Sequence, residues 1–115
     1  MKLIVAIIQP TKLDAVQDAL RRVGVARMTV GDAMGYARQR GLDPTYRGNE
    51  YKTNLLRKIS LEIAVNDDFV ERTLDCLRQV ARTGAEGNIG DGKAFVLPLE
   101  QAIQISDGHS GPGAV

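Results

Sequence analysis

The chain has 115 residues, of which 43% are hydrophobic and 25% charged, and this size predicts one domain, residues 1–115, with a single modest core. Its formal net charge of +1 does not favour a nucleic-acid-binding protein or one held on an anionic membrane surface. The lone cysteine, Cys76, excludes an internal disulfide framework, and no apolar run is long enough to span a bilayer, so we expect a cytoplasmic protein.

The first part of the chain predicts a strand, a helix and a second strand. Residues 3–8 form an apolar run that is typical of a buried strand. Thr11 is the expected N-cap of a helix whose apolar residues recur at helical spacing until Gly24, where we expect a glycine C-cap. From Val25 the pattern alternates, as in a strand. One face of this strand carries only small residues, which are Thr29, Gly31, Ala33 and Gly35. This face leaves room for another backbone or for a ligand.

A polar, glycine-punctuated stretch follows over about residues 37–55. Long structureless connections in compact domains are usually functional or disordered, so we expect a loop that contacts another molecule. Its arginines, Arg38, Arg40 and Arg47, form a positive cluster, although a solvated charged loop is the commoner explanation of such a cluster. Tyr51 has little core to fill here, which makes it a candidate for interface anchoring or covalent modification. Tyr46 is a second such candidate.

The second part of the chain repeats the order of the first. Residues 59–65 alternate as in a half-buried strand, and Asp67 is the expected cap of a second amphipathic helix. A glycine-rich turn, a strand at residues 94–97 and a short apolar segment at 102–105 follow. The Gly/Ser/Pro-rich residues 107–115 predict a flexible tail.

The order of these elements predicts a ferredoxin-like α+β fold of the βαββαβ type. Its two helices can cover only one face of a four-stranded sheet. Because an exposed sheet face in so small a chain usually finds a partner, we expect a homo-oligomer.

One short motif favours an anion site. The segment Gly90-Asp91-Gly92-Lys93 lies between a helix and a strand, where backbone amides freed by glycine can hold phosphate and Lys93 can add a positive charge. The tetrapeptide alone is more often an ordinary glycine-rich turn, but Arg82 and Thr83 just before it shift the balance towards an anion site. Lys58 is equally a surface lysine or a carboxylate ligand. The sequence contains no nucleophile, acid/base or His/Cys metal constellation, so we expect no enzyme and no prosthetic group.

Taken together, these segments resemble the P-II signal transduction proteins of nitrogen metabolism. The similar segments are residues 7–14, residues 35–51 and residues 90–96, so the resemblance extends over nearly the whole chain. It implies a ferredoxin-like homotrimer, with residues 37–55 as the T-loop, residues 82–93 as the B-loop and residues 104–108 within the C-loop. The turn at residues 84–89 makes this B-loop longer than the usual form.

The resemblance also implies a nucleotide site. In the family, ATP and ADP compete for clefts between subunits. If the family's nucleotide-binding positions are carried over to this chain, Thr29 lines the base pocket and Arg38 reaches the terminal phosphate. The residues implied to hold the other phosphates are Gly90, Asp91, Gly92 and Lys93.

Three further residues match positions that sense effectors in the family. Gln39 resembles the residue that joins Mg-ATP to 2-oxoglutarate, so the only metal implied is magnesium held through the nucleotide. Lys58 resembles the residue that pairs with a 2-oxoglutarate carboxylate. Tyr51 matches the tyrosine that is uridylylated in many bacterial members.

The function implied is that of a non-enzymatic regulator of nitrogen-assimilation enzymes, transporters or regulators. Its T-loop would contact an ammonium transporter at the membrane, a uridylyltransferase or a regulatory enzyme, and no nucleic acid. Gln104 and Ser106 stand where the family commonly carries two phosphate-binding arginines, and Gln9 replaces a usual lysine. An alternative therefore stays open, namely a divergent sensor of ADP or AMP plus another small anion, regulating transport or carbon metabolism.

Overall fold

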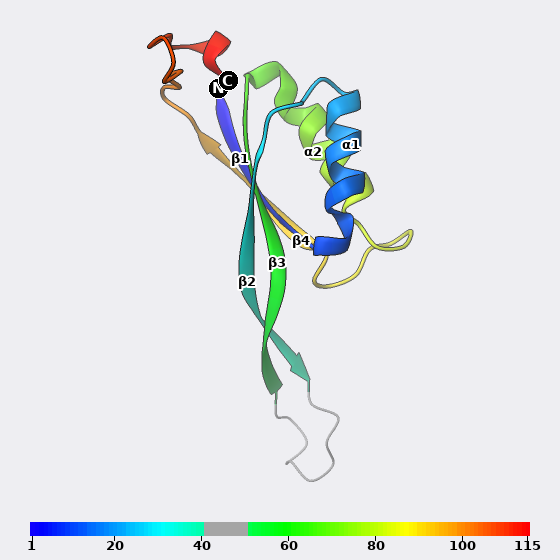
Figure 1. Cartoon of the computed structure of the whole chain (residues 1–115). Helices are drawn as coiled ribbons and strands as arrows, with labels where there is room; N and C mark the ends of the chain where they lie inside the picture. Colours follow the sequence, from blue (N-terminus) through cyan, green and yellow to red (C-terminus); the bar gives the residue numbers. More distant parts are fainter. Residues whose placement is uncertain (41–50) are drawn as a thin grey trace.

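The computed structural model describes the backbone of residues 1–40 and 51–115, and the side chains of residues 1–36 and 55–115. In that part, four antiparallel strands form one sheet in the order β2-β3-β1-β4 (Figure 1). The strands and helices are β1 (Lys2–Ile8), α1 (Leu13–Arg22), β2 (Thr29–Arg40), β3 (Tyr51–Val65), α2 (Val70–Val80) and β4 (Gly92–Pro98). This is the ferredoxin-like α+β fold predicted from the order of the elements.

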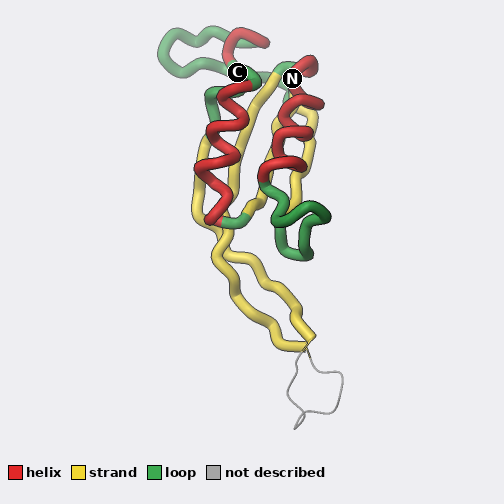
Figure 2. Tube along the Cα trace, turned by 90° about the vertical axis from the view of Figure 1, so that its right-hand side faces the viewer, coloured by secondary structure: helices red, strands yellow, loops and turns green. Residues whose placement is uncertain are grey.

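Both helices pack on one face of the sheet (Figure 2). The opposite face, which we call the open face, carries no helix of the described chain. The strand register places Leu3, Val5 and Ile7 of β1 on it, and Val5 lies directly beside Phe95 of β4. Phe95 and Leu97 are exposed. The open face is therefore apolar along β1 and β4.

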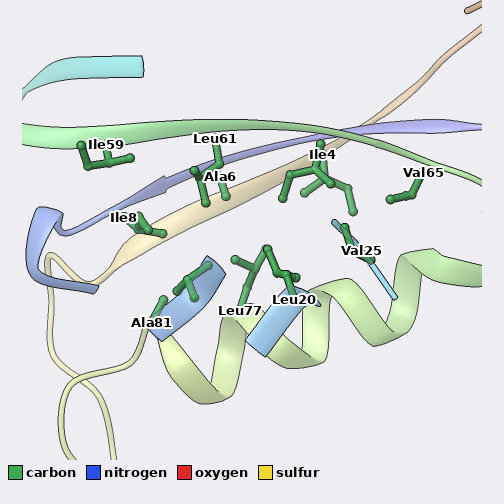
Figure 3. Close-up of a cluster of buried hydrophobic side chains, with 12 residues drawn as sticks. Ile4, Ala6, Ile8, Leu20, Val25, Ile59, Leu61, Val65, Leu77 and Ala81 are labelled. Carbon is green, nitrogen blue, oxygen red and sulfur yellow. The ribbon is translucent and has the colours of Figure 1, made fainter. Parts of the chain in front are cut away.

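The core lies between the helices and the two central strands (Figure 3). Alternate residues of β1 and β3 point to the helices, because side chains of a strand alternate between its two faces. The fully or nearly fully buried members are Ile4, Ala6, Ile8, Val16, Leu20, Val25, Ile59, Leu61, Ile63, Val65, Leu77 and Ala81. Each large aliphatic side chain buried here contributes roughly 1.5 to 3 kcal/mol to folding. This core fixes the places at which the loops leave the sheet.

The helix ends show where the sequence predicted the local structure correctly and where it did not. Gly24 has φ 91°, and Val25 N donates to Leu20 O at 2.9 Å, which confirms the expected glycine C-cap. Thr11 and Asp67 do not cap the α-helices directly. Each lies in a 3-10 turn, Pro10–Lys12 or Asp67–Phe69, that leads into the helix.

The strands β2 and β3 extend well beyond the core. Residues 35–40 of β2 pair with residues 51–56 of β3, and we call this pair the ribbon. It projects away from the helices in both views (Figures 1 and 2). The sequence predicted a loop over residues 37–55, because these residues are polar. Backbone pairing between two strands does not require apolar side chains, so residues 37–40 and 51–55 are strand and not loop. Residues 41–50, with Tyr46 and Arg47, lie outside the described residues.

The end of the chain, for which the sequence predicted a flexible tail, carries hydrogen bonds of its own. Gln104 N donates to His109 O at 2.7 Å, and Gly111 N donates to Ala102 O at 3.1 Å. These bonds fold residues 102–111 into a small hairpin. Within the described residues, the helices are too short and too polar to traverse a bilayer.

Candidate functional site

The loop between α2 and β4 is organised around one carboxylate. Thr83 donates to Asp91 twice, from its backbone N to Oδ2 at 2.9 Å and from its hydroxyl to Oδ1 at 2.7 Å. Asn88 N donates to Asp91 Oδ2 at 2.8 Å. Both carboxylate oxygens therefore accept hydrogen bonds from the loop itself.

The side chain of Asn88 closes the loop from the other side. Its Nδ2 donates to Thr83 Oγ1 at 2.7 Å and to Thr83 O at 3.3 Å, while Asp91 N donates to Asn88 O at 3.1 Å. We call Thr83, Asn88 and Asp91 the loop triad. Arg82 spans the turn between these residues by donating to Ala85 O at 3.2 Å.

Hydrogen bonds from Thr83 and Asn88 stabilise the ionised form of Asp91. The backbone amide of Thr83, then its hydroxyl, and then the amide of Asn88 lower the pKa of Asp91 from 3.8 to about 2. Each of these hydrogen bonds favours the ionised form. Asp91 is therefore a carboxylate at neutral pH, and its charge is engaged by donors of the loop.

Glycine is required where the loop enters β4. Gly90 and Gly92 have φ values of 100° and 128°, a region that side chains rarely allow. A Cβ on Gly92 would also overlap the carbonyl oxygen of Ile7 in the neighbouring strand β1. The glycines therefore let the loop backbone approach both the sheet and any ligand closely.

Two polar side chains from outside the loop hold the carbonyl of Gly90. Lys58 Nζ donates to Gly90 O at 2.7 Å, and Gln9 Nε2 donates to the same oxygen at 3.4 Å. Lys58 belongs to β3 and lies just beyond the base of the ribbon, so one charged hydrogen bond links the strand that continues into the ribbon to the loop. Gln9 follows β1, and sequence reasoning gave it no such role.

A cavity of about 400 Å³ lies beside this loop, between α2, β1 and β4. Its floor is formed by apolar residues, among them Ile8, Leu77 and Val96. Its charged lining residues are Arg78, Arg82, Asp91 and Lys93. A cavity with an apolar wall and a few cations suits a ligand with a planar apolar part and an anionic end.

The structure brings together some of the predicted site residues and separates others. Lys58, Gly90, Asp91, Gly92 and Lys93 gather at one end of β1 and β4. Thr29 lies on β2, at the opposite edge of the sheet, three strands away from β4. That separation is roughly 14 Å at a spacing of about 4.8 Å between strands.

The remaining predicted residues lie on the ribbon. Arg38 and Gln39 are in β2, opposite Thr53 and Lys52, and Tyr51 begins β3. The side chains of Arg38, Gln39 and Tyr51 lie outside the described residues. Among the residues whose side chains are described, no three His, Cys, Asp or Glu gather as a metal site.

The role expected for Asp91, holding phosphate, stays a prediction, and sequence reasoning missed the contacts that Asn88 makes in the loop. A signal was available, because Asn, Asp and Thr side chains commonly hydrogen-bond to the backbone of turns. Their pairing with one another across the loop, however, depends on the path of the chain between them.

Comparisons with known proteins agree with this architecture. A sequence model of the family described as "Nitrogen regulatory protein P-II" matches residues 1–109. A nitrogen regulatory protein P-II of Bradyrhizobium diazoefficiens is 49% identical over 115 residues, which is the whole of both chains. The nitrogen regulatory protein GlnK1 of Methanosarcina mazei is 46% identical over 115 residues, covering 100% of this chain and 97% of the relative.

A solved structure extends the likeness to three dimensions. The GlnK of B. subtilis superimposes with a TM-score of 0.80 at 26% sequence identity, covering 99% of this chain and 97% of the other. The family match, the full-length relatives and the shared fold agree with one another. The chain belongs to the nitrogen regulatory protein P-II family.

Proposed function

We propose that this protein is a non-enzymatic, nucleotide-responsive regulator of nitrogen assimilation. ATP or ADP is the effector, and its phosphates bind at the glycine-rich loop between α2 and β4. The observation that carries the proposal is a 400 Å³ cavity lined by Gly92 and Lys93 of this loop and by the cations Arg78 and Arg82. Backbone amides and cations together are what a phosphate chain requires.

The nucleotide occupies a cleft between copies of the chain, and the assembly is a homotrimer. Thr29 and the phosphate loop lie at opposite edges of one sheet, so a single copy cannot bring them to one ligand. A second copy that sets its β2 edge against this β4 edge would do so. The apolar open face, with Phe95 and Leu97 exposed, supports such an assembly.

The ribbon transmits the ligand state to a target. 2-Oxoglutarate binds with Mg-ATP through Gln39 and Lys58, and it competes with Gly90 O for the Lys58 ammonium group. The hydrogen bond of 2.7 Å between Lys58 Nζ and Gly90 O supports this coupling, since it already joins the strand that continues into the ribbon to the loop. The target is an ammonium transporter docked at the membrane, a uridylyltransferase acting on Tyr51, or a regulatory enzyme.

A second candidate is a sensor of ADP or AMP together with another small anion, acting on transport or carbon metabolism. It is favoured by the side chains of Gln104 and Ser106. Gln104 Nε2 donates to Ser106 Oγ at 3.0 Å, so these two uncharged groups satisfy each other. Two cations at these positions would have stabilised a triphosphate more than a monophosphate.

Isothermal calorimetry separates the two candidates. The purified protein is titrated with ATP, ADP and AMP, each with and without magnesium and 2-oxoglutarate. Tight Mg-ATP binding that 2-oxoglutarate strengthens is the expected result for the nitrogen sensor. Binding restricted to ADP or AMP and indifferent to 2-oxoglutarate would favour the second candidate. Absence of binding by all three nucleotides would refute both.

A further inference from the structure

We propose that Asp91 and Asn88 are positioning residues of the anion site. They hold residues 90–93 in the shape that receives phosphate groups, and the Asp91 carboxylate itself touches neither phosphate nor magnesium. The inference rests on the proposed nucleotide binding and reverses the role first expected for Asp91.

The hydrogen bonds of the loop triad carry the argument. Asp91 accepts two bonds at Oδ2 and one at Oδ1, all between 2.7 and 2.9 Å. A carboxylate offers about four lone-pair sites, so most of its capacity is already used within the loop. Bonds to an ionised acceptor are roughly twice as strong as neutral ones, which makes them costly to exchange for a ligand.

The same bonds explain why a negative residue stands in an anion site. The charge of Asp91 is satisfied by the amides of Thr83 and Asn88 and by the hydroxyl of Thr83. The backbone that follows, Gly92 and Lys93, then enters β4 in a fixed direction. A loop held in its binding shape before the ligand arrives avoids the ordering cost of binding.

Three roles for Asp91 predict three different results for Asp91→Asn. If Asp91 positions the loop, the substitution removes charge-assisted hydrogen bonds. The NH2 group of the new amide then faces N–H donors from which it cannot accept a hydrogen bond. ATP and ADP should then bind about tenfold more weakly or worse, with and without magnesium. A carboxylate that faced the phosphates would instead repel them, so the variant would bind more tightly. If Asp91 were a ligand of magnesium, the variant would lose only the part of nucleotide binding that depends on magnesium.

A matched control and a pair of Thr83 variants test whether an effect on binding comes from lost positioning of the loop, from a change in charge or from a change in folding. Glu86→Gln removes a negative charge from an exposed side chain of the same loop and should leave nucleotide affinity within about twofold. Thr83→Val removes the hydroxyl donor and should weaken binding severalfold, whereas Thr83→Ser keeps the hydroxyl and should bind as wild type. Circular dichroism and thermal melting check that each variant is folded.

Amide hydrogen exchange supplies a readout that needs no ligand. In Asp91→Asn, the amides of Thr83 and Asn88 should exchange faster than in the wild type, while the helices keep their protection. Slower or unchanged exchange with unchanged affinity would overturn the inference and leave the proposed function standing. A wild-type protein that binds no nucleotide would overturn both.

Discussion

At the scale of single residues, Gly92 at the entry into β4 is the glycine at which an added Cβ would meet another atom most closely. Gly92 combines a φ of 128° with a backbone so close to Ile7 that a Cβ would overlap the carbonyl oxygen. Because the obstacle is backbone of the central strand β1, no side-chain rotation can relieve it.

We therefore expect Gly92→Ala to lower the free energy of unfolding by more than about 2 kcal/mol, from backbone strain and displacement of β4. Urea unfolding followed by circular dichroism measures this change. Gly31→Ala is the control, since a Cβ at Gly31 meets nothing within 4 Å and its φ is not positive. Its unfolding free energy should stay within about 0.5 kcal/mol of the wild type. Equal stability of the two variants would contradict the close approach at Gly92.

Residue types alone predicted an anion site at residues 90–93, which stays a prediction, but they did not reveal the hydrogen bonds within this loop. The glycines and Lys93 pointed to an anion site because their chemistry is local. Asp91 was grouped with them because it lies between two glycines. Its partners Thr83 and Asn88 are eight and three residues away, and only the path of the loop brings them to it.

At the scale of elements, the loop between α2 and β4 should lose its order in acid. The pKa of Asp91 is lowered from 3.8 to about 2 by its hydrogen bonds to Thr83 and Asn88. A lowered pKa means that the stabilising contribution is fully present above 3.8 and is lost as the pH falls through about 2. An NMR titration of the Asp91 carboxyl carbon should give a midpoint near 2. A midpoint close to 3.8 would show that the carboxylate lacks these donors.

The link between β3 and the loop gives a second prediction for elements. Lys58→Ala removes the ammonium group that donates to Gly90 O at 2.7 Å. If Lys58 also holds a 2-oxoglutarate carboxylate, this effector should bind at least about tenfold more weakly, because charged hydrogen bonds contribute roughly 1.5 to 3 kcal/mol. Calorimetry in the presence of Mg-ATP measures the loss.

Arg57→Ala is the matched control for Lys58→Ala. It removes a cation from the adjacent position of β3, where Arg57 pairs with Asp32 at 3.0 Å and both side chains are exposed. Exposed ion pairs contribute little, so 2-oxoglutarate binding should stay close to that of the wild type. Equal losses in the two variants would point to general charge rather than to a direct contact between Lys58 and the effector.

The sequence predicted the existence and order of the elements better than their ends. Apolar periodicity identified both helices and the buried parts of β1 and β3, since burial depends on residue type. It did not detect the ribbon, whose strands are held by backbone pairing rather than by a core. It also expected Thr11 and Asp67 to be caps, whereas both lie in 3-10 turns.

At the scale of the whole molecule, the open face should hold the copies of the chain together. Phe95 lies beside Val5 on that face and is exposed in the single chain. Phe95→Glu would place a charge in an apolar interface, so we expect a folded protein that no longer forms trimers. Size-exclusion chromatography with light scattering gives the mass, to be compared with multiples of 12.5 kDa.

Met34→Glu is the control for this substitution. Met34 is also exposed but pairs with Arg57, which places it on the helix side of the sheet. The variant should keep the mass of the wild type. A trimer that survives Phe95→Glu but not Met34→Glu would place the interface on the other side of the sheet.

The position of Thr29 and the phosphate loop at opposite edges of the sheet has a consequence for how the protein responds inside a cell. If the nucleotide site is completed only by two copies of the chain, as proposed, binding obeys mass action in the protein as well as in the nucleotide. Its apparent dissociation constant should therefore rise on dilution below the concentration at which the copies separate. Under that condition the amount of protein present helps to set the nucleotide level at which the signal changes.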